Sequence, residues 1–261
     1  MKTFIENCEF TWDMVRGLPK SYYCYKNNIP HTVMHKPGLE KLYSFGSINT
    51  KISEFEEVND TTTYLFEGPE WINTGWSPPP LKEMYKGKLK LDKPSIVIQN
   101  KYTTEWGSGP YNYFSVEFLD NLFSHFKDKY TVIYIRPEGQ DKGYYVDHNH
   151  FVTFDDYKLI EDKHPEIFLF NDYVKKFSDI DYNTLQFIVE ATSEKHITVS
   201  GGNACVAAYF GGDVIIYDSP QGAGAGRGIW KTDSWLNKLS GAKIHGYNEY
   251  NLLLDKVKKL W

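Results

Sequence analysis

In the second half of the chain, short apolar runs alternate with longer stretches of helical periodicity. The apolar runs are rich in β-branched residues and predict strands. They are Ser95–Gln99, Tyr130–Ile135, Glu166–Phe170, Ile197–Val199, Val214–Tyr217 and Ala242–Gly246. Helices are predicted at Ser115–Phe126, Tyr182–Glu194, Ala204–Phe210 and Asn248–Leu260. This alternation predicts an α/β fold with a doubly wound parallel sheet and right-handed crossovers.

The first part of the chain has a less regular pattern. A turn and a helix are predicted within Phe10–Tyr25, with Asp13 near the start, and short strands at His31–His35 and Leu42–Phe45. The proline run at Trp76–Pro80 excludes a helix there and favours an extended segment. The lysine-rich stretch that follows marks a boundary, so we expect one domain at residues 1–92 and a second at 93–261.

Composition and charge narrow the class of protein. The 261 residues are 41% hydrophobic and 24% charged, which is typical of a globular domain. The net charge of −5 argues against nucleic-acid binding. Three cysteines, Cys8, Cys24 and Cys205, fit no zinc spacing and favour a reducing compartment. With no signal peptide or membrane span visible, we expect a cytoplasmic protein, in the host cytoplasm if the source is viral.

The stretch from His196 to Tyr217 is the strongest chemical signal. It is predicted as a strand, a tight turn at Ser200-Gly201-Gly202-Asn203, a small-residue helix and a second strand. A helix that begins after a Gly-rich turn directs free backbone N–H groups at one spot, which favours an anion such as a diphosphate. The alternative is a packing turn with no ligand.

Polar loops follow the predicted strands, and a doubly wound sheet binds ligands at the carboxyl ends of its strands. Cationic and amide side chains in these loops are Lys101, Arg136, Asn171, Arg227 and Lys231. Each cation alone is typical of a solvated surface. Several at one edge, beside a Gly-rich helix start, predict a phosphate-bearing ligand.

Other motifs carry less weight. The chain has no P-loop and no nucleophile elbow, and Gly222–Gly228 lacks the spacing of a dinucleotide fingerprint, so we expect a loop there that closes over ligand. Asp147, His148 and His150 have metal-capable side chains but are expected in a polar loop. Asp179 and Asp181 precede a predicted helix, where capping explains them.

The second half resembles the donor-binding half of GT-B nucleotide-sugar glycosyltransferases, in particular heptosyltransferase-like and fucosyltransferase-like members. Ser95–Gln99 with the Lys101 loop is similar to their first C-terminal strand and phosphate loop, and the stretch from His196 to Tyr217 is similar to a late unit of that half. The general character also resembles glycosyltransferases of large algal viruses. The N-terminal half is shorter than is usual in the family. The resemblance implies two Rossmann-like halves, a short acceptor half and a donor half.

In the N-terminal half, Asp13-Met-Val-Arg-Gly-Leu-Pro19 is similar to the heptosyltransferase segment whose Asp acts as the base. The resemblance therefore implies that Asp13 takes the proton of an acceptor hydroxyl of a glycan, with Glu9 and His31 as further candidates, and plain helix capping as the alternative. Cations and the helix start would replace a metal ion, so no metal or other cofactor is expected beside the nucleotide sugar. Two alternatives remain open: a non-catalytic nucleotide- or sugar-binding module, and a sugar-nucleotide epimerase of the two-domain type.

Overall fold

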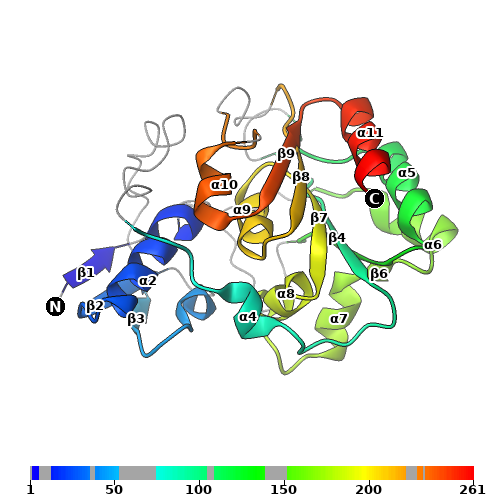
Figure 1. The fold of residues 1–261 in the computed structure, drawn as a ribbon. Helices are drawn as coiled ribbons and strands as arrows, with labels where there is room; N and C mark the ends of the chain where they lie inside the picture. Colours follow the sequence, from blue (N-terminus) through cyan, green and yellow to red (C-terminus); the bar gives the residue numbers. More distant parts are fainter. Residues whose placement is uncertain are drawn as a thin grey trace.

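A parallel sheet forms the centre of the larger part of the molecule (Figure 1). The computed structural model describes residues 2–5, 13–35, 39–52, 75–104, 109–138, 152–221, 228–231 and 233–261. Six strands pair in the order β6-β5-β4-β7-β8-β9, and every pair is parallel. They are β4 (Ser95–Gln99), β5 (Thr131–Ile135), β6 (Phe168–Leu169), β7 (Ser193–Val199), β8 (Asp213–Tyr217) and β9 (Lys243–Tyr247). The predicted doubly wound parallel sheet is confirmed.

Helices cover both faces of this sheet (Figure 1). One face carries α5 (Val116–Phe126), α6 (Asp156–Lys163) and α11 (Tyr250–Leu260). The other carries α7 (Phe170–Lys176), α8 (Tyr182–Glu190), α9 (Gly202–Tyr209) and α10 (Trp235–Ser240). Alternation along β4 serves both layers, because Ile96 and Ile98 pack on the first set and Val97 packs on the second. A fully buried strand of this kind needs the continuous apolar run that the sequence shows.

Local signals explain where the helices begin. The Ser115 hydroxyl accepts a hydrogen bond from the Phe118 amide at 3.2 Å and caps α5, whose apolar positions at 118, 119, 122, 123 and 126 are all buried. The Asp181 carboxylate accepts from the Thr184 amide at 2.9 Å and caps α8. The capping role predicted for Asp181 is therefore confirmed.

A second, smaller sheet lies in the N-terminal part. Its strands β1 (Lys2–Ile5), β2 (His31–His35) and β3 (Asn49–Ile52) are parallel and pair in chain order. Between β1 and β2 the chain forms a π-helical turn, η1 (Asp13–Gly17), and the helix α2 (Leu18–Lys26). A short 3-10 helix, η2 (Glu40–Tyr43), precedes β3, and α4 (Leu81–Tyr85) precedes the large sheet.

One apolar cluster joins the two parts of the chain. Met14 and Leu18 from the N-terminal part pack in the same cluster as the small side chains of α9. The Tyr209 hydroxyl donates a hydrogen bond to the Met14 carbonyl, and the rings of Tyr85 and Phe187 lie 5.4 Å apart between α4 and α8. A division into domains at residue 92 stays a prediction.

Three predicted elements differ from the structure. The segment Leu42–Phe45 is not a strand, because Leu42 and Tyr43 belong to η2, where both side chains are buried. The third strand is reduced to Phe168–Leu169, and Phe170 already begins α7. The helix predicted to Glu194 ends at Glu190, since β7 begins at Ser193 and pairs there with Ser95. None of the helices in the described part of the chain combines the length and apolar character that crossing a bilayer needs.

Candidate functional site

The carboxyl ends of β4 and β7 meet at the point where the sheet changes winding direction. From β4 the chain crosses to β5 through α5 on one face, and from β7 it crosses to β8 through α9 on the other. Ile98 lies opposite Ile197, so Asn100–Lys101 and Ser200–Gly201 both leave the sheet at this edge. In doubly wound sheets a ligand crevice lies outside such a switch point.

The N-terminus of α9 lies at this edge. Gly201 is its N-cap residue with φ of 139°, a conformation that a residue with a side chain rarely adopts, and no side chain caps the helix. The first amides of a helix have no partner within it, and the helix dipole places positive potential there. A Cβ atom built on Gly201 would lie 3.8 Å from the Lys101 ammonium nitrogen. A helix start and a cation therefore converge, as predicted.

A buried hydroxyl adds a polar atom to the same turn. The Ser200 side chain is only 3% exposed, and its Oγ has no hydrogen-bond partner in the part of the chain that the structure describes. The Ser200 amide is satisfied by the Tyr217 carbonyl at 2.8 Å. A buried hydroxyl without a partner costs about 1–3 kcal/mol, which a bound ligand or water would recover.

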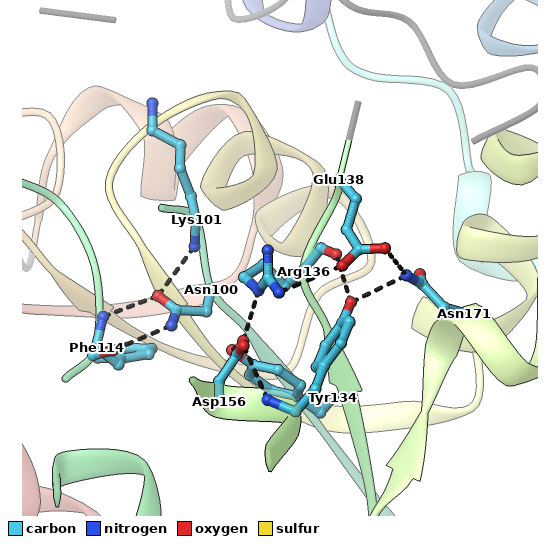
Figure 2. A network of polar contacts seen from close by, with 9 residues as sticks. Asn100, Lys101, Phe114, Tyr134, Arg136, Glu138, Asp156 and Asn171 are labelled. Atoms are coloured by element: carbon cyan, nitrogen blue, oxygen red, sulfur yellow. Dashed lines mark hydrogen bonds and ion pairs between the residues drawn. The ribbon is translucent and has the colours of Figure 1, made fainter. Parts of the chain in front are cut away.

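Asn100 fixes the direction of the loop after β4 (Figure 2). It is fully buried, and its amide donates to the Ile135 carbonyl at 2.8 Å. Its side-chain oxygen accepts from the amides of Lys101 at 2.9 Å and Phe114 at 2.8 Å, and its Nδ2 donates to the Phe114 carbonyl at 3.1 Å. Every polar group of Asn100 therefore has a role in holding the backbone that carries Lys101.

Arg136 follows β5 at the same edge, but its charge is already balanced (Figure 2). Its Nε donates to Asp156 Oδ2 at 2.6 Å, and both side chains are almost completely buried. Its guanidinium also lies over the Tyr157 ring, 4.4 Å from the centroid. Burial alone would lower the pKa of Arg136, and the hydrogen bond and charge of Asp156 raise it above its usual value. Arg136 is a fixed cation in a buried ion pair.

The same carboxylate also orders its neighbours. The Tyr134 hydroxyl donates to Asp156 Oδ2 at 2.5 Å, and the Tyr157 amide donates to Oδ1 at 2.9 Å. Burial, followed by the charge of Asp156, raises the pKa of Tyr134 well above its usual value, so this phenol stays neutral and keeps donating. Sequence reasoning missed Asp156, because the 20 residues that separate it from Arg136 give no local signal of the contact.

Asn171 stands on α7 and contacts the network from its other side (Figure 2). Its Nδ2 donates to the Tyr157 hydroxyl at 2.9 Å and to Glu138 Oε2 at 3.2 Å. Glu138 Oε1 accepts from Arg136 Nη2 at 3.4 Å. The predicted donor-site residues Arg136 and Asn171 are thus at the expected edge of the sheet, and both hold Glu138, which the sequence did not single out.

The remaining predicted donor residues are placed in part. Gly202 begins α9 and Asn203 follows it with a half-buried side chain. Lys231 is exposed, and its amide donates to the Gly228 carbonyl at 3.2 Å. Arg227 and most of the Gly222–Gly228 loop lie outside the described residues.

Asp13 is the first residue of η1 and is completely buried. An acceptor hydroxyl would reach its carboxylate only after η1 moves. His31 is committed elsewhere: its Nδ1 donates to the Ile29 carbonyl at 2.9 Å, and in the neutral ring its Nε2 accepts from the Ser21 hydroxyl at 2.8 Å. Glu9 lies outside the described residues. The base assignment stays a prediction.

Below the switch point lies a second buried polar group that sequence reasoning missed. Glu190 of α8 accepts a hydrogen bond from Gln99 Nε2 at the end of β4, and its other oxygen lies 3.0 Å from His196 Nε2 in β7. All three side chains are at most 1% exposed. Glu190 therefore links the two strands whose ends form the candidate site.

The described ranges contain no cluster of three or more His, Cys, Asp or Glu side chains arranged to hold a metal ion. Asp181 uses both carboxylate oxygens on Thr184. Asp147, His148 and His150 lie outside the described residues. Comparisons with protein-family models, curated proteins and solved structures give no match to this chain.

Proposed function

We propose that this protein is a GT-B-like glycosyltransferase that moves a sugar from a nucleotide diphosphate sugar to a hydroxyl of a glycan. The observation that carries the proposal is the uncapped start of α9 behind Gly201, with the Lys101 ammonium beside it at the switch point of a doubly wound sheet. Helix N-termini of this kind bind phosphate groups. The Ser200 hydroxyl supplies a further polar contact.

The chemistry of sugar transfer matches this arrangement. As the bond to the anomeric carbon breaks, negative charge develops on the departing diphosphate. Fixed positive groups aimed at that charge stabilise the transition state more than the ground state. Lys101 and the amides of α9 would do this without a divalent metal. We therefore expect transfer to continue in EDTA, and loss of transfer that Mn²⁺ or Mg²⁺ restores would contradict this part of the proposal.

The acceptor enters from the N-terminal part. The second parallel sheet, β1-β2-β3, supports an arrangement of two Rossmann-like halves, and η1 packs in the same apolar cluster as α9. Asp13 begins η1, so movement of this segment would bring its carboxylate to an acceptor hydroxyl held beside the donor. A carboxylate in that position acts as a general base.

The test is a turnover measurement with a panel of UDP-, GDP- and CDP-sugars, with and without glycan acceptors. A glycosyltransferase releases nucleoside diphosphate, slowly into water and faster when a suitable acceptor is present. An epimerase converts one sugar nucleotide into another without releasing the nucleotide. A non-catalytic binding module leaves every compound unchanged. Either of the last two results would overturn the proposal in favour of the corresponding alternative.

A further inference from the structure

Glu138 is a carboxylate held in a fixed position at the carboxyl edge of the sheet, yet its side chain is 46% exposed. Two donors from different elements hold it, Arg136 Nη2 on Oε1 and Asn171 Nδ2 on Oε2 (Figure 2). Exposed glutamates usually retain their rotamer freedom, and ordering one costs up to about 2 kcal/mol. A surface carboxylate ordered from both sides, two positions beyond a fully buried arginine, is built to accept hydrogen bonds.

The charges on the two sides of the switch point differ. On the β5 side, one guanidinium, Arg136, faces two carboxylates, Asp156 and Glu138, so this group carries excess negative charge. On the β7 side lie the Lys101 ammonium and the positive end of α9. A phosphate is attracted to the β7 side and repelled from the β5 side. The part of a ligand that faces Glu138 must therefore be neutral and must donate hydrogen bonds.

We infer that Glu138 accepts hydrogen bonds from the hydroxyl groups of a sugar ring whose attached phosphate lies against Gly201 and Lys101. The inference rests on the proposed function, because it takes the phosphate site as given. A carboxylate has about four lone-pair positions, and the printed contacts of Glu138 use two of them. β5, β4 and β7 are consecutive in the sheet, so their carboxyl ends span about 10 Å. A sugar ring joined to one or two phosphates bridges such a span.

Two sources supply this chemistry, the ribose of the nucleotide and the transferred sugar. The inference is that one of them contacts Glu138, and calorimetric titration decides which. The wild-type protein and Glu138→Gln are titrated with inorganic pyrophosphate, with UDP and GDP, with their 2′-deoxy forms, and with the sugar nucleotide that the turnover panel identifies. Glu161→Gln, an exposed residue on α6, is the matched control because it removes the same charge away from the edge.

If ribose contacts Glu138, the wild type binds the ribonucleotide about 10- to 100-fold more tightly than the deoxynucleotide, and Glu138→Gln brings this ratio toward one. If the transferred sugar contacts it, the substitution weakens only the sugar nucleotide by a similar factor. Pyrophosphate affinity stays the same or rises slightly in both cases. Asn171→Leu, which removes one of the two donors holding Glu138, should shift the same ratio by less.

Two further outcomes separate this inference from the proposed function. Nucleotide binding that is equal in wild type and Glu138→Gln for every ligand would overturn the role of Glu138 and leave the proposed function standing. Absence of binding by pyrophosphate and every nucleotide to the wild type would overturn both. Circular dichroism confirms that the variants are folded, which the exposed position of Glu138 favours.

Discussion

The Lys101 ammonium nitrogen lies 3.8 Å from the point that a Cβ atom of Gly201 would occupy, although the two residues follow different strands and are separated by almost one hundred positions. The relationship depends on the pairing of β4 with β7 and on Asn100, which orients the Lys101 backbone. It places a mobile cation next to an uncapped helix start, and it explains why a glycine occupies this position: only a residue without a side chain leaves the backbone amides open at φ of 139°.

Replacing this glycine should separate ligand binding from stability. In Gly201→Ala the added Cβ is in ordinary contact with Lys101, so the cost comes from backbone strain, about 1–3 kcal/mol. The strain and the added methyl group should both weaken nucleotide binding. Gly241→Ala is the control, because Gly241 also has positive φ, 76°, with open space around it at the end of α10. Urea unfolding should show destabilisation in both variants, and calorimetry should show weaker binding only in Gly201→Ala. Equal affinity in the two folded variants would argue against the phosphate site.

Asp156 should be a main determinant of stability at the β5 edge. Asp156→Ala leaves the Arg136 charge buried without its partner, which costs about 3–5 kcal/mol. The comparison is Asp162→Ala, which breaks an exposed pair with Lys158 on the same helix and should change the unfolding free energy very little. Chemical denaturation of both variants measures the difference. A cost for Asp156→Ala as small as that of Asp162→Ala would show that the buried pair contributes no stability.

Asp13 should affect turnover without affecting the donor. Asn keeps the size of the side chain but cannot accept a proton, so Asp13→Asn should slow transfer by about 10²–10⁴-fold. Nucleotide affinity should stay the same, because the phosphate groups lie at Gly201. Rates of nucleotide release and calorimetric affinities are compared for this variant and wild type. Full turnover in Asp13→Asn would show that another group is the base, and equal loss of nucleotide binding would place Asp13 in the donor site.

The pH dependence of stability should include a contribution from Asp120. Hydrogen bonds from Lys163 and His164, at 2.9 and 2.7 Å, lower the pKa of this carboxyl in the folded protein. A lowered folded-state pKa stabilises the protein above the unfolded-state value near 4, and this contribution is lost as the pH falls through the folded-state pKa. Urea unfolding at pH 6 and at pH 3 should show a smaller difference for Asp120→Asn than for wild type. Asp92→Asn, at an exposed position, should behave like wild type; if Asp120→Asn does so too, the contribution is absent.

The sequence predicted those parts of the fold that depend on local pattern. The β-branched runs of β4, β5 and β8 leave no alternative to buried strands, and Ser115 and Asp181 mark helix starts by their own hydrogen bonds. Leu42–Phe45 was misassigned because four apolar or aromatic positions fit a strand and a 3-10 turn equally well. Tertiary packing of Leu42 and Tyr43 decides between the two.

The candidate site shows the same division. The rule that ligands bind at strand ends brought Lys101 and Ser200–Gly202 together correctly. It could not show what Arg136 faces, because Asp156 and Asn171 reach the edge from separate helices. Hence Arg136 was predicted as a phosphate ligand, whereas the structure pairs it with carboxylates. The link between Gln99, Glu190 and His196 escaped notice for the same reason, since it joins two strands and a helix.

The most direct test of the central claim, a nucleotide-sugar site at the start of α9, is a thermal-shift screen of the whole chain with UDP, GDP, CDP and their sugar derivatives. A ligand at 100 times its Kd stabilises the folded state by about 2.7 kcal/mol, which is a clear rise in Tm. The account predicts that one base produces this rise with both its diphosphate and its sugar nucleotide, and that the rise is strongly reduced in Gly201→Ala but not in Gly241→Ala. No change in Tm with any compound at millimolar concentration would contradict it.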